Sequence, residues 1–288
     1  MPSVRDTIQR THRVLESVGI PESRLEAEVI VMNLMRMRRQ DIFANQEVEV
    51  SAQQEEDLAR VVERRLKREP LAYILGYREF YGINLLVNSS VLVPRPETEH
   101  LVEHALFMSL MGMETPELVI ADVGTGSGAI AISLAIHLPS ARIYAVDTAD
   151  PVLDVASYNI RAHNVADRVT LCKGDLLAPL PEPVDLVVAN LPYIPTSRLT
   201  SLQPEVQWEP REALDGGPDG LDQIRRLISQ AGGKLKSHGI ILLELDPDQV
   251  PAVEELARRY LPGAATSVEQ DLAHQDRVFV INRGATDC

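Results

Sequence analysis

The chain has 288 residues, of which 45% are hydrophobic and 24% are charged, and its formal net charge is −14. This length accommodates one large domain and a smaller one. No apolar run reaches the roughly 18–20 residues of a membrane span, and the N-terminus carries charges where a signal peptide would be apolar. The cysteines, Cys172 and Cys288, are too few and too far apart for a disulfide framework or a cysteine-based metal site. We therefore expect a cytoplasmic protein without a bound metal.

The negative charge counts against direct binding of nucleic acid, because proteins that grip phosphates usually carry a basic face. Residues 1–70 are nearly neutral, however, and contain basic clusters at Arg36–Arg39 and Arg60–Arg68. These clusters could contact an acidic or ribonucleoprotein partner, although solvated helix faces produce the same pattern. We expect a monomer without membrane attachment.

Residues 1–75 are predicted to form a small helical domain. Apolar residues recur at helical spacing up to Gly19 and again after Pro21. Ser51 and Gln54 form a capping box that opens a further helix. No repeat or low-complexity tract interrupts this pattern.

Residues 76–95 change character. Aromatic and β-branched residues flank Gly82 and a turn at Asn88-Ser89-Ser90. This pattern predicts a β-hairpin that links two domains. Residues 96–288 form the second predicted domain, which opens with a helix.

From about residue 117, apolar strands alternate with helical stretches. Repeated strand–helix units predict an α/β fold, with a Rossmann-like parallel sheet covered by helices on both faces. The final two strands are separated by too few residues for a helix, so we expect an antiparallel last strand at the end of the sheet. Strands are expected near 118–123, 142–146, 168–172, 184–189, 239–245, 264–269 and 277–282.

A glycine-rich loop directly follows the strand at 118–123. Glycine lets the backbone turn sharply and lets a ligand approach without a Cβ clash, and open α/β sheets bind ligands at this carboxyl end of their strands. The next strand ends in Asp147, whose carboxylate can accept hydrogen bonds from both hydroxyls of a ribose. The loop consists of Gly124, Thr125, Gly126, Ser127 and Gly128.

This loop alone leaves the ligand open. The same spacing fits a dinucleotide whose pyrophosphate sits at a helix N-terminus, and a tight turn without a ligand is the simplest alternative. Asp122, just before the loop, favours S-adenosylmethionine. A carboxylate there suits the positively charged amino group of that cofactor and would repel a pyrophosphate.

A second set of residues follows the strand at 184–189. Asn190 offers a carbonyl acceptor and an NH2 donor, Pro192 stiffens the turn, and Tyr193 supplies a flat face for stacking. An ordinary turn after a strand has a similar composition. Because the segment Asn190-Leu191-Pro192-Tyr193 lies at the same sheet edge as the glycine loop, a binding role is the favoured interpretation.

These groups suit a planar nitrogen as the methyl acceptor, either an amide or the exocyclic amine of a base. Asn190 Oδ1 and the Leu191 backbone carbonyl can accept the two N–H bonds of its NH2 group. Such hydrogen bonds orient the nitrogen toward a methyl donor and stabilise the positive charge that develops on it. No strong base is required.

The chain resembles the release-factor glutamine methyltransferases over nearly its whole length. VLVPRPETE is the most discriminating segment, since related methyltransferases of a ribosomal-protein glutamine continue differently after the Pro-Arg pair. The resemblance implies an enzyme that uses S-adenosyl-L-methionine to methylate the glutamine N5 in the Gly-Gly-Gln tripeptide of class I peptide chain release factors, and so modulates translation termination. It is also carried by the helical N-terminal region, EPLAYILGYREFYG, DVGTGSGAIAISLA, NLPYI, EPREALDGGPDGLDQIRRLI and DLAHQDRVF.

The resemblance also implies roles for individual residues. The glycine loop would contact the methionine part of the cofactor, Asp147 its ribose, and the segment Asn190–Tyr193 the glutamine amide. Asp175 would lie near the adenine, with a helix cap as the alternative. Arg95 and Glu97 would line the approach to the active site, although Glu97 equally suits the first turn of a helix. The helical domain would dock the protein substrate.

Three positions depart from the family pattern. Leu191 stands where a proline is usual, and Asp246 and His274 replace glycines. Asn-Leu-Pro-Tyr also occurs in rRNA enzymes that dimethylate adenine N6, which lack the helical domain and the PRPETE segment. Methylation of a base amine in DNA or RNA, or of a ribosomal-protein glutamine, therefore stays open. A nicotinamide-dependent oxidoreductase and a non-catalytic binding module are more distant alternatives.

Overall fold

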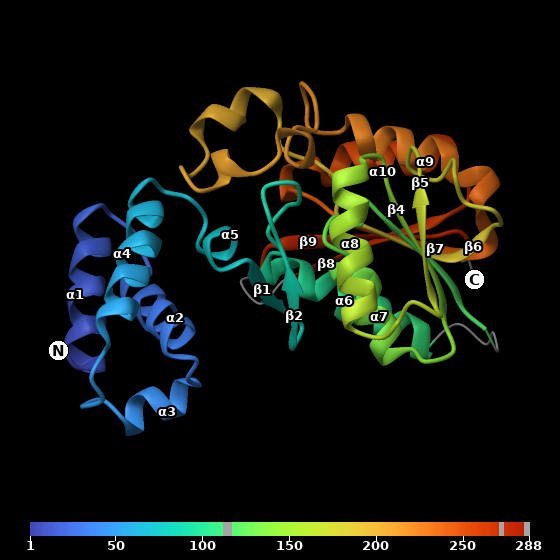
Figure 1. Cartoon of the computed structure of the whole chain (residues 1–288). Helices are drawn as coiled ribbons and strands as arrows, with labels where there is room; N and C mark the ends of the chain where they lie inside the picture. The colour runs from blue at the N-terminus through green and yellow to red at the C-terminus, as the bar shows by residue number, and fades with distance from the viewer. Residues whose placement is uncertain (112–116, 271–273, 285–288) are drawn as a thin grey trace. The chain divides into compact units, whose positions relative to one another are not determined.

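The computed structural model describes residues 1–111, 117–270 and 274–284 (Figure 1). The chain divides into two compact units. The first comprises Met1–Gly76 together with Gln203–Trp208, and the second comprises Tyr77–Leu202 and Glu209–Cys288. Among the described residues, no helix has both the length and the apolar character needed to span a membrane.

The first unit is helical, as the spacing of its apolar residues predicts. The capping box expected at Ser51 is confirmed, because the Gln54 N–H donates to Ser51 Oγ at 3.3 Å and the Ser51 N–H donates to Gln54 Oε1 at 2.9 Å. The short helices α3 and α5 were not expected from the sequence. The helices are α1 (Val4–Ser17), α2 (Ser23–Met35), α3 (Arg39–Ala44), α4 (Ala52–Leu66) and α5 (Leu71–Leu75).

A buried arginine joins parts of this unit that are far apart in the sequence. Arg65 of α4 donates to both carboxylate oxygens of Glu26, at 2.7 and 3.0 Å, and to Glu205 Oε1 at 2.8 Å. Its side chain is only 3% exposed, so losing one partner would leave a buried charge undercompensated. Glu205 belongs to the segment Gln203–Trp208, and this contact explains why that segment is part of the helical unit.

The hairpin predicted within residues 76–95 is confirmed. The strands β1 (Tyr77–Phe80) and β2 (Ile83–Leu86) pair antiparallel around a two-residue turn. Phe80 and Leu85 are fully buried in the core of the second unit. The hairpin is therefore packed into the sheet-containing unit and is not a free linker.

The second unit contains a seven-stranded sheet whose strand order is β5-β4-β3-β6-β7-β9-β8. The first five strands in this order are parallel, and β9 pairs antiparallel with both β7 and β8. The expected antiparallel last strand is confirmed, although it lies inside the sheet and β8 forms the edge. The strands are β3 (Val119–Val123), β4 (Arg142–Asp147), β5 (Val169–Lys173), β6 (Val184–Ala189), β7 (Leu235–Glu244), β8 (Ala265–Gln270) and β9 (Asp276–Asn282).

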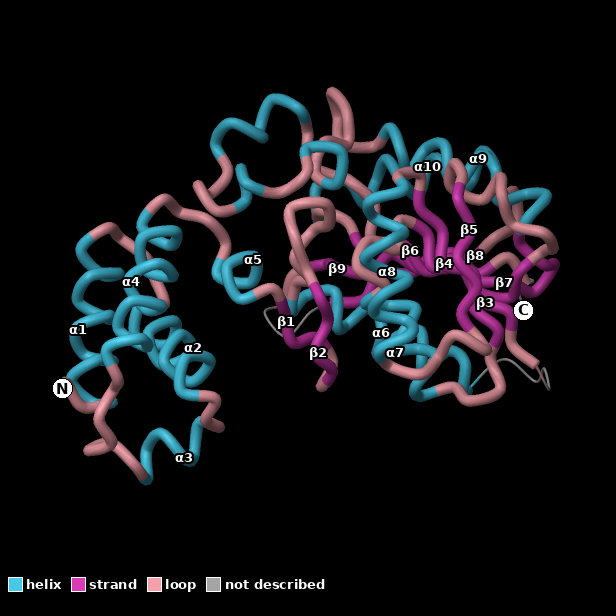
Figure 2. Tube along the Cα trace, in the orientation of Figure 1, coloured by secondary structure: helices cyan, strands magenta, loops and turns pink. Residues whose placement is uncertain are grey.

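Helices cover both faces of this sheet (Figure 2). Alternate residues of a strand point to opposite faces: Ile120 packs in a cluster with residues of α6, α7 and α8, while Ala121 packs in a cluster with residues of α9 and α10. The α-helices are α6 (Pro96–Met111), α7 (Ala129–His137), α8 (Asp150–Ala162), α9 (Asp222–Lys234) and α10 (Val250–Tyr260). The 3₁₀ helices are η1 (Thr196–Ser201), η2 (Val206–Trp208), η3 (Arg211–Ala213) and η4 (Pro247–Gln249).

The parallel strands bring polar residues to one edge of the sheet. Asp122 lies near the end of β3, Asp147 and Glu244 end β4 and β7, and Asn190 follows β6. Because these four strands are neighbours and run in the same direction, their carboxyl ends meet at a single edge.

Candidate active site

A cavity of about 630 Å³ lies at this carboxyl edge, within the second unit. It combines three segments that the sequence analysis selected independently: the glycine loop, the end of β4 and the segment after β6. Its wall includes the predicted site residues Gly124, Gly126, Asp147, Asp175, Asn190, Leu191 and Pro192.

The glycine loop and the segment after β6 touch one another at Gly124. This residue has φ +76°, and a Cβ there would lie 3.1 Å from Leu191 Cδ2 and 3.6 Å from the Asn190 carbonyl oxygen. A side chain at position 124 would therefore be strained and would fill the space between the two segments. Leu191, the residue that replaces the usual proline, is buried against this loop.

Three of the loop residues do not belong to the wall of the cavity: Thr125, Ser127 and Gly128. Thr125 is buried and donates through Oγ1 to Asp122 Oδ2 at 2.6 Å. Ser127 is buried as well, and its backbone carbonyl accepts from Asn159 Nδ2 at 2.8 Å. Gly128 opens α7. These residues hold the shape of the loop, while Gly124 and Gly126 form its cavity side.

Asp122 is fully buried and does not belong to the wall of the cavity. Its Oδ2 accepts from Thr125 Oγ1 and, at 3.1 Å, from the Ala131 N–H, so the carboxyl group ties the loop to the first turn of α7. Burial raises the pKa of Asp122 to about 7. Its Oδ1 is buried without a hydrogen-bond partner among the described residues. The structure therefore places Asp122 behind the loop, where it braces the backbone.

Asp147 lies between the loop and the cavity. Its Oδ2 accepts from the Gly126 N–H at 3.2 Å, and its Oδ1 accepts from the Thr148 N–H at 2.8 Å. The carboxylate is half-buried and keeps acceptor capacity toward the cavity.

Asp175 also lines the cavity, and it does so from the loop after β5. Its Oδ2 accepts from Arg226 at 2.6 Å and from Gln230 Nε2 at 3.2 Å, both in α9. The Asp175 side chain therefore bonds to α9 and does not cap a helix, which was the alternative interpretation. Arg226 is also part of the cavity wall, so the wall contains an ion pair between Arg226 and Asp175.

Behind the cavity, Asn190 and Tyr193 are anchored by one carboxylate. Asn190 Nδ2 donates to Thr98 Oγ1 at 2.9 Å, and Thr98 Oγ1 donates to Glu244 Oε2 at 2.7 Å. The Tyr193 hydroxyl donates to Glu244 Oε1 at 3.3 Å. Burial raises the pKa of Glu244 and also that of Tyr193. Tyr193 is not part of the cavity wall, and its hydroxyl end is held in the protein.

The segment is also braced from its outer side by the loop of the GGPDG sequence. The Ile194 N–H donates to the Leu214 carbonyl at 3.1 Å, and the Gly216 N–H donates to the Ile194 carbonyl at 2.9 Å. Gln249 Nε2 donates to the Tyr193 carbonyl at 2.8 Å. The EPREALDGGPDGL stretch therefore supports the backbone of the segment that follows β6.

Arg95 and Glu97 lie outside the wall of this cavity. Arg95 pairs with Glu209 at 2.5 Å, and Glu209 also accepts from the Val93 N–H at 3.1 Å. Glu209 is buried, and burial raises its pKa in spite of these two partners. Glu97 is exposed in the first turn of α6.

Sequence reasoning did not assign roles to Thr98 and Glu244. Glu244 ends an apolar strand in the same way as Asp147, so the strand-end signal that identified Asp147 applies to it equally. Thr98 lies inside the PRPETE segment, but no local pattern distinguishes it from its neighbours. Only the fold shows that its hydroxyl meets Asn190.

The two other departures from the family pattern have local explanations. Asp246 caps η4 through the Asp248 N–H and pairs with Arg198 at 2.9 Å. His274 has φ +58°, in the left-handed region that favours glycine, and it is exposed. Neither residue belongs to the cavity wall.

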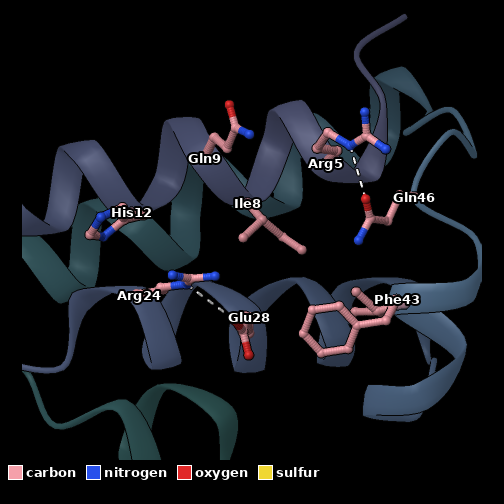
Figure 3. Close-up of a pocket in the computed structure, with 9 residues that line it drawn as sticks. Arg5, Ile8, Gln9, His12, Arg24, Glu28, Phe43 and Gln46 are labelled. Atoms are coloured by element: carbon pink, nitrogen blue, oxygen red, sulfur yellow. Dashed lines mark hydrogen bonds and ion pairs between the residues drawn. The ribbon is translucent and has the colours of Figure 1, made fainter.

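The helical unit has a cavity of its own, of about 380 Å³ (Figure 3). Arg5, Arg24 and Phe43 contribute to its wall. Arg5 donates to Gln46 at 2.9 Å, and Arg24 pairs with Glu28 at 3.7 Å. None of the predicted site residues lies there, so this cavity is separate from the glycine-loop site.

Comparison with known proteins agrees with both units. Residues 6–76 match the family described as PrmC N-terminal domain, and residues 103–207 match the family described as Ribosomal protein L11 methyltransferase (PrmA). A solved methyltransferase from Pyrococcus furiosus, 13% identical, has a TM-score of 0.51 and covers 82% of this chain and 100% of its own, which supports the fold alone.

Full-length relatives are more specific. A release factor glutamine methyltransferase from Moorella thermoacetica is 42% identical, and the match covers 98% of this chain and 99% of that protein. One from Coxiella burnetii is 37% identical, over 99% of this chain and 100% of that protein. At this identity along nearly its whole length, the chain belongs to the release factor glutamine methyltransferase family.

Proposed function

We propose that this enzyme transfers a methyl group from S-adenosylmethionine to the side-chain amide nitrogen, N5, of the glutamine in the Gly-Gly-Gln tripeptide of class I release factors. The observation that carries the proposal is the orientation of Asn190. Its Nδ2 is bound to Thr98, and its Oδ1 accepts no hydrogen bond from the described residues. The side chain therefore offers a free acceptor beside the glycine loop.

The cavity fits S-adenosylmethionine. A cradle without side chains at Gly124 and Gly126 suits close approach of the methionine part, and the half-buried Asp147 suits a ribose. Asp175 and Arg226 stand further along the wall, where the adenine would lie. The bound cofactor supplies an electrophilic methyl group on a sulfonium sulfur.

The acceptor amide needs orientation more than it needs a base. An amide nitrogen is a weak nucleophile because its lone pair is delocalised. Asn190 Oδ1 and the Leu191 carbonyl would accept the two N–H bonds, holding the nitrogen in line and favouring positive charge on it. Within the described residues, the Leu191 carbonyl accepts no backbone hydrogen bond. Removing one such acceptor would reduce turnover roughly 10²–10³-fold.

The helical unit would provide the docking surface for the release factor. Its cavity is bordered by Phe43, which is 48% exposed and carries the Arg39 guanidinium at 5.9 Å from its ring centroid. An exposed aromatic residue beside a hollow is typical of a binding surface.

Mass spectrometry of a release factor tests the proposal. After incubation with enzyme and S-adenosylmethionine, the peptide containing Gly-Gly-Gln is expected to gain one methyl group on glutamine. Asn190→Ala should slow this gain roughly 10²–10³-fold. Ser133→Ala, which removes a buried hydroxyl of α7 away from the cavity, should keep it. A wild-type enzyme that binds the cofactor but leaves the glutamine unmodified would overturn the proposal.

A further inference from the structure

Behind Asn190, the hydrogen bond to Thr98 continues as a relay that ends at a buried carboxylate. It runs from Asn190 Nδ2 to Thr98 Oγ1 over 2.9 Å and from Thr98 Oγ1 to Glu244 Oε2 over 2.7 Å. Thr98 is 5% exposed and Glu244 is 2% exposed. The three residues come from the segment after β6, the first turn of α6 and the end of β7.

The carboxylate sets the direction of this relay. Both carboxylate oxygens of Glu244 accept from hydroxyl groups, Oε2 from Thr98 and Oε1 from Tyr193, so the single hydroxyl proton of Thr98 points to Glu244. The lone pairs of Thr98 Oγ1 can then only accept from Asn190. Asn190 must present Nδ2 to Thr98, and its Oδ1 consequently faces the other way. A flipped Asn190 would set two acceptor oxygens against each other.

We propose that Thr98 and Glu244 are positioning residues that fix the orientation of the Asn190 amide, and that they thereby select an N–H-donating glutamine over a glutamate. The inference rests on the proposed function for the identity of the acceptor. A glutamine presents two N–H donors to Asn190 Oδ1 and the Leu191 carbonyl. A glutamate carboxylate would present only acceptor oxygens to the same two acceptors.

Glu244 also holds the other end of the segment, because its Oε1 accepts from the Tyr193 hydroxyl at 3.3 Å. Burial is the largest influence on Glu244 and raises its pKa, whereas Arg277 favours its ionised form and Glu97 opposes it. One buried carboxylate thus anchors both Asn190 and Tyr193. Both contacts require an acceptor at position 244. In Glu244→Gln, the side-chain NH2 group could donate to Thr98, and Asn190 would no longer be held in one orientation.

Peptide binding tests whether Thr98 and Glu244 make the site select glutamine over glutamate. Peptides containing Gly-Gly-Gln or Gly-Gly-Glu would be titrated into the enzyme saturated with S-adenosylhomocysteine, which prevents turnover. The wild type is expected to prefer the glutamine peptide at least about tenfold. Glu244→Gln, which is isosteric but can donate to Thr98, and Thr98→Val should each lower this preference about tenfold. Thr98→Ser, which keeps the hydroxyl, should retain it, as should Ser133→Ala.

The affinity for S-adenosylhomocysteine distinguishes a loss of Asn190 positioning from a general loss of folding in the variants. It should change less than about twofold in all four variants, because Thr98, Glu244 and Ser133 lie outside the cavity wall. An unchanged peptide preference in Glu244→Gln and Thr98→Val, with cofactor binding intact, would overturn the inference.

Nuclear magnetic resonance gives a second reading that needs neither peptide nor turnover. The Asn190 side-chain NH2 signals, assigned by their loss in Asn190→Ala, should show slow hydrogen exchange in the wild type and in Thr98→Ser. They should exchange at least about tenfold faster in Thr98→Val. Rapid exchange in the wild type would overturn the relay even if the other variants failed to fold. Slow exchange without methylation of any release factor would refute the proposed substrate and leave the relay standing.

Discussion

Gln249 Nε2 donates a hydrogen bond to the Tyr193 carbonyl at 2.8 Å, and it lies within 3.4 Å of the Asp219 and Gly220 carbonyls. One buried amide at the end of η4 therefore joins the acceptor segment to the GGPDG loop. This contact holds the backbone at Tyr193, and Gln249 itself is not part of the cavity wall. The geometry of the segment Asn190–Tyr193 thus depends on a residue that lies outside the cavity wall.

Gln249→Ala should leave the half-buried Tyr193 carbonyl without this donor. A buried acceptor left unpaired costs about 1–3 kcal/mol of folding stability. We expect a loss of that size in urea unfolding, together with a lower kcat for methylation and an unchanged affinity for S-adenosylhomocysteine. Asp248→Ala, at the exposed neighbouring position, is the control. Equal stability of the two variants would contradict the bracing role.

Gly220→Ala should be much more damaging than Gly263→Ala. Both residues have a left-handed backbone, with φ +77° and +86°, so both substitutions carry about 1–2 kcal/mol of backbone strain. A Cβ at Gly220 would also lie 2.2 Å from the Tyr193 carbonyl oxygen, whereas one at Gly263 meets nothing within 4 Å. We expect Gly220→Ala to lose activity and Gly263→Ala to keep it, as measured by methylation and thermal unfolding. An equal loss of activity in both variants would show that backbone strain alone, and not the contact with the Tyr193 carbonyl, causes the damage.

Asp122 should make folding stability fall as the pH rises. Its pKa is about 7 in the folded protein against 3.8 ordinarily, so between these values the folded state binds the extra proton. The stability of the wild type relative to Asp122→Asn should therefore decline by roughly 2–4 kcal/mol from pH 5 to pH 8 and stay level above that. Urea unfolding of both proteins at each pH measures this difference. Parallel curves would show that Asp122 does not titrate in this range.

Phe43→Ser should weaken recognition of the intact release factor and spare the short peptide. The ring is exposed beside the cavity of the helical unit, and truncating an interface aromatic residue costs about 1–2 kcal/mol or more. We expect KM for the whole factor to rise about fivefold or more, with kcat/KM for a Gly-Gly-Gln peptide unchanged. Val18→Ser removes a residue of the same unit that is 41% exposed and away from that cavity, and it should change neither. A reduced kcat/KM for both the whole factor and the peptide would show that Phe43 is needed for folding and not for docking.

Much of the site was readable in the sequence because it depends on local order along the chain. An apolar strand followed at once by glycines and a helix predicts a loop at the carboxyl end of that strand. Asp147 and Asn190 follow the same rule, and the cavity contains both residues. The alternation of strands and helices likewise predicted a parallel sheet, since each intervening helix carries the chain back to the end of the sheet where the previous strand began.

The tertiary structure alone decided what stands behind these residues. Thr98 and Asn190 are 92 positions apart and Thr98 and Glu244 are 146 apart, so no local spacing reveals that a hydroxyl joins an amide to a carboxylate. The same holds for Gln249, which reaches Tyr193 across 56 positions. Sequence periodicity reports which face of an element is buried, but hydrogen-bond direction depends on atoms brought together by the packing of separate elements.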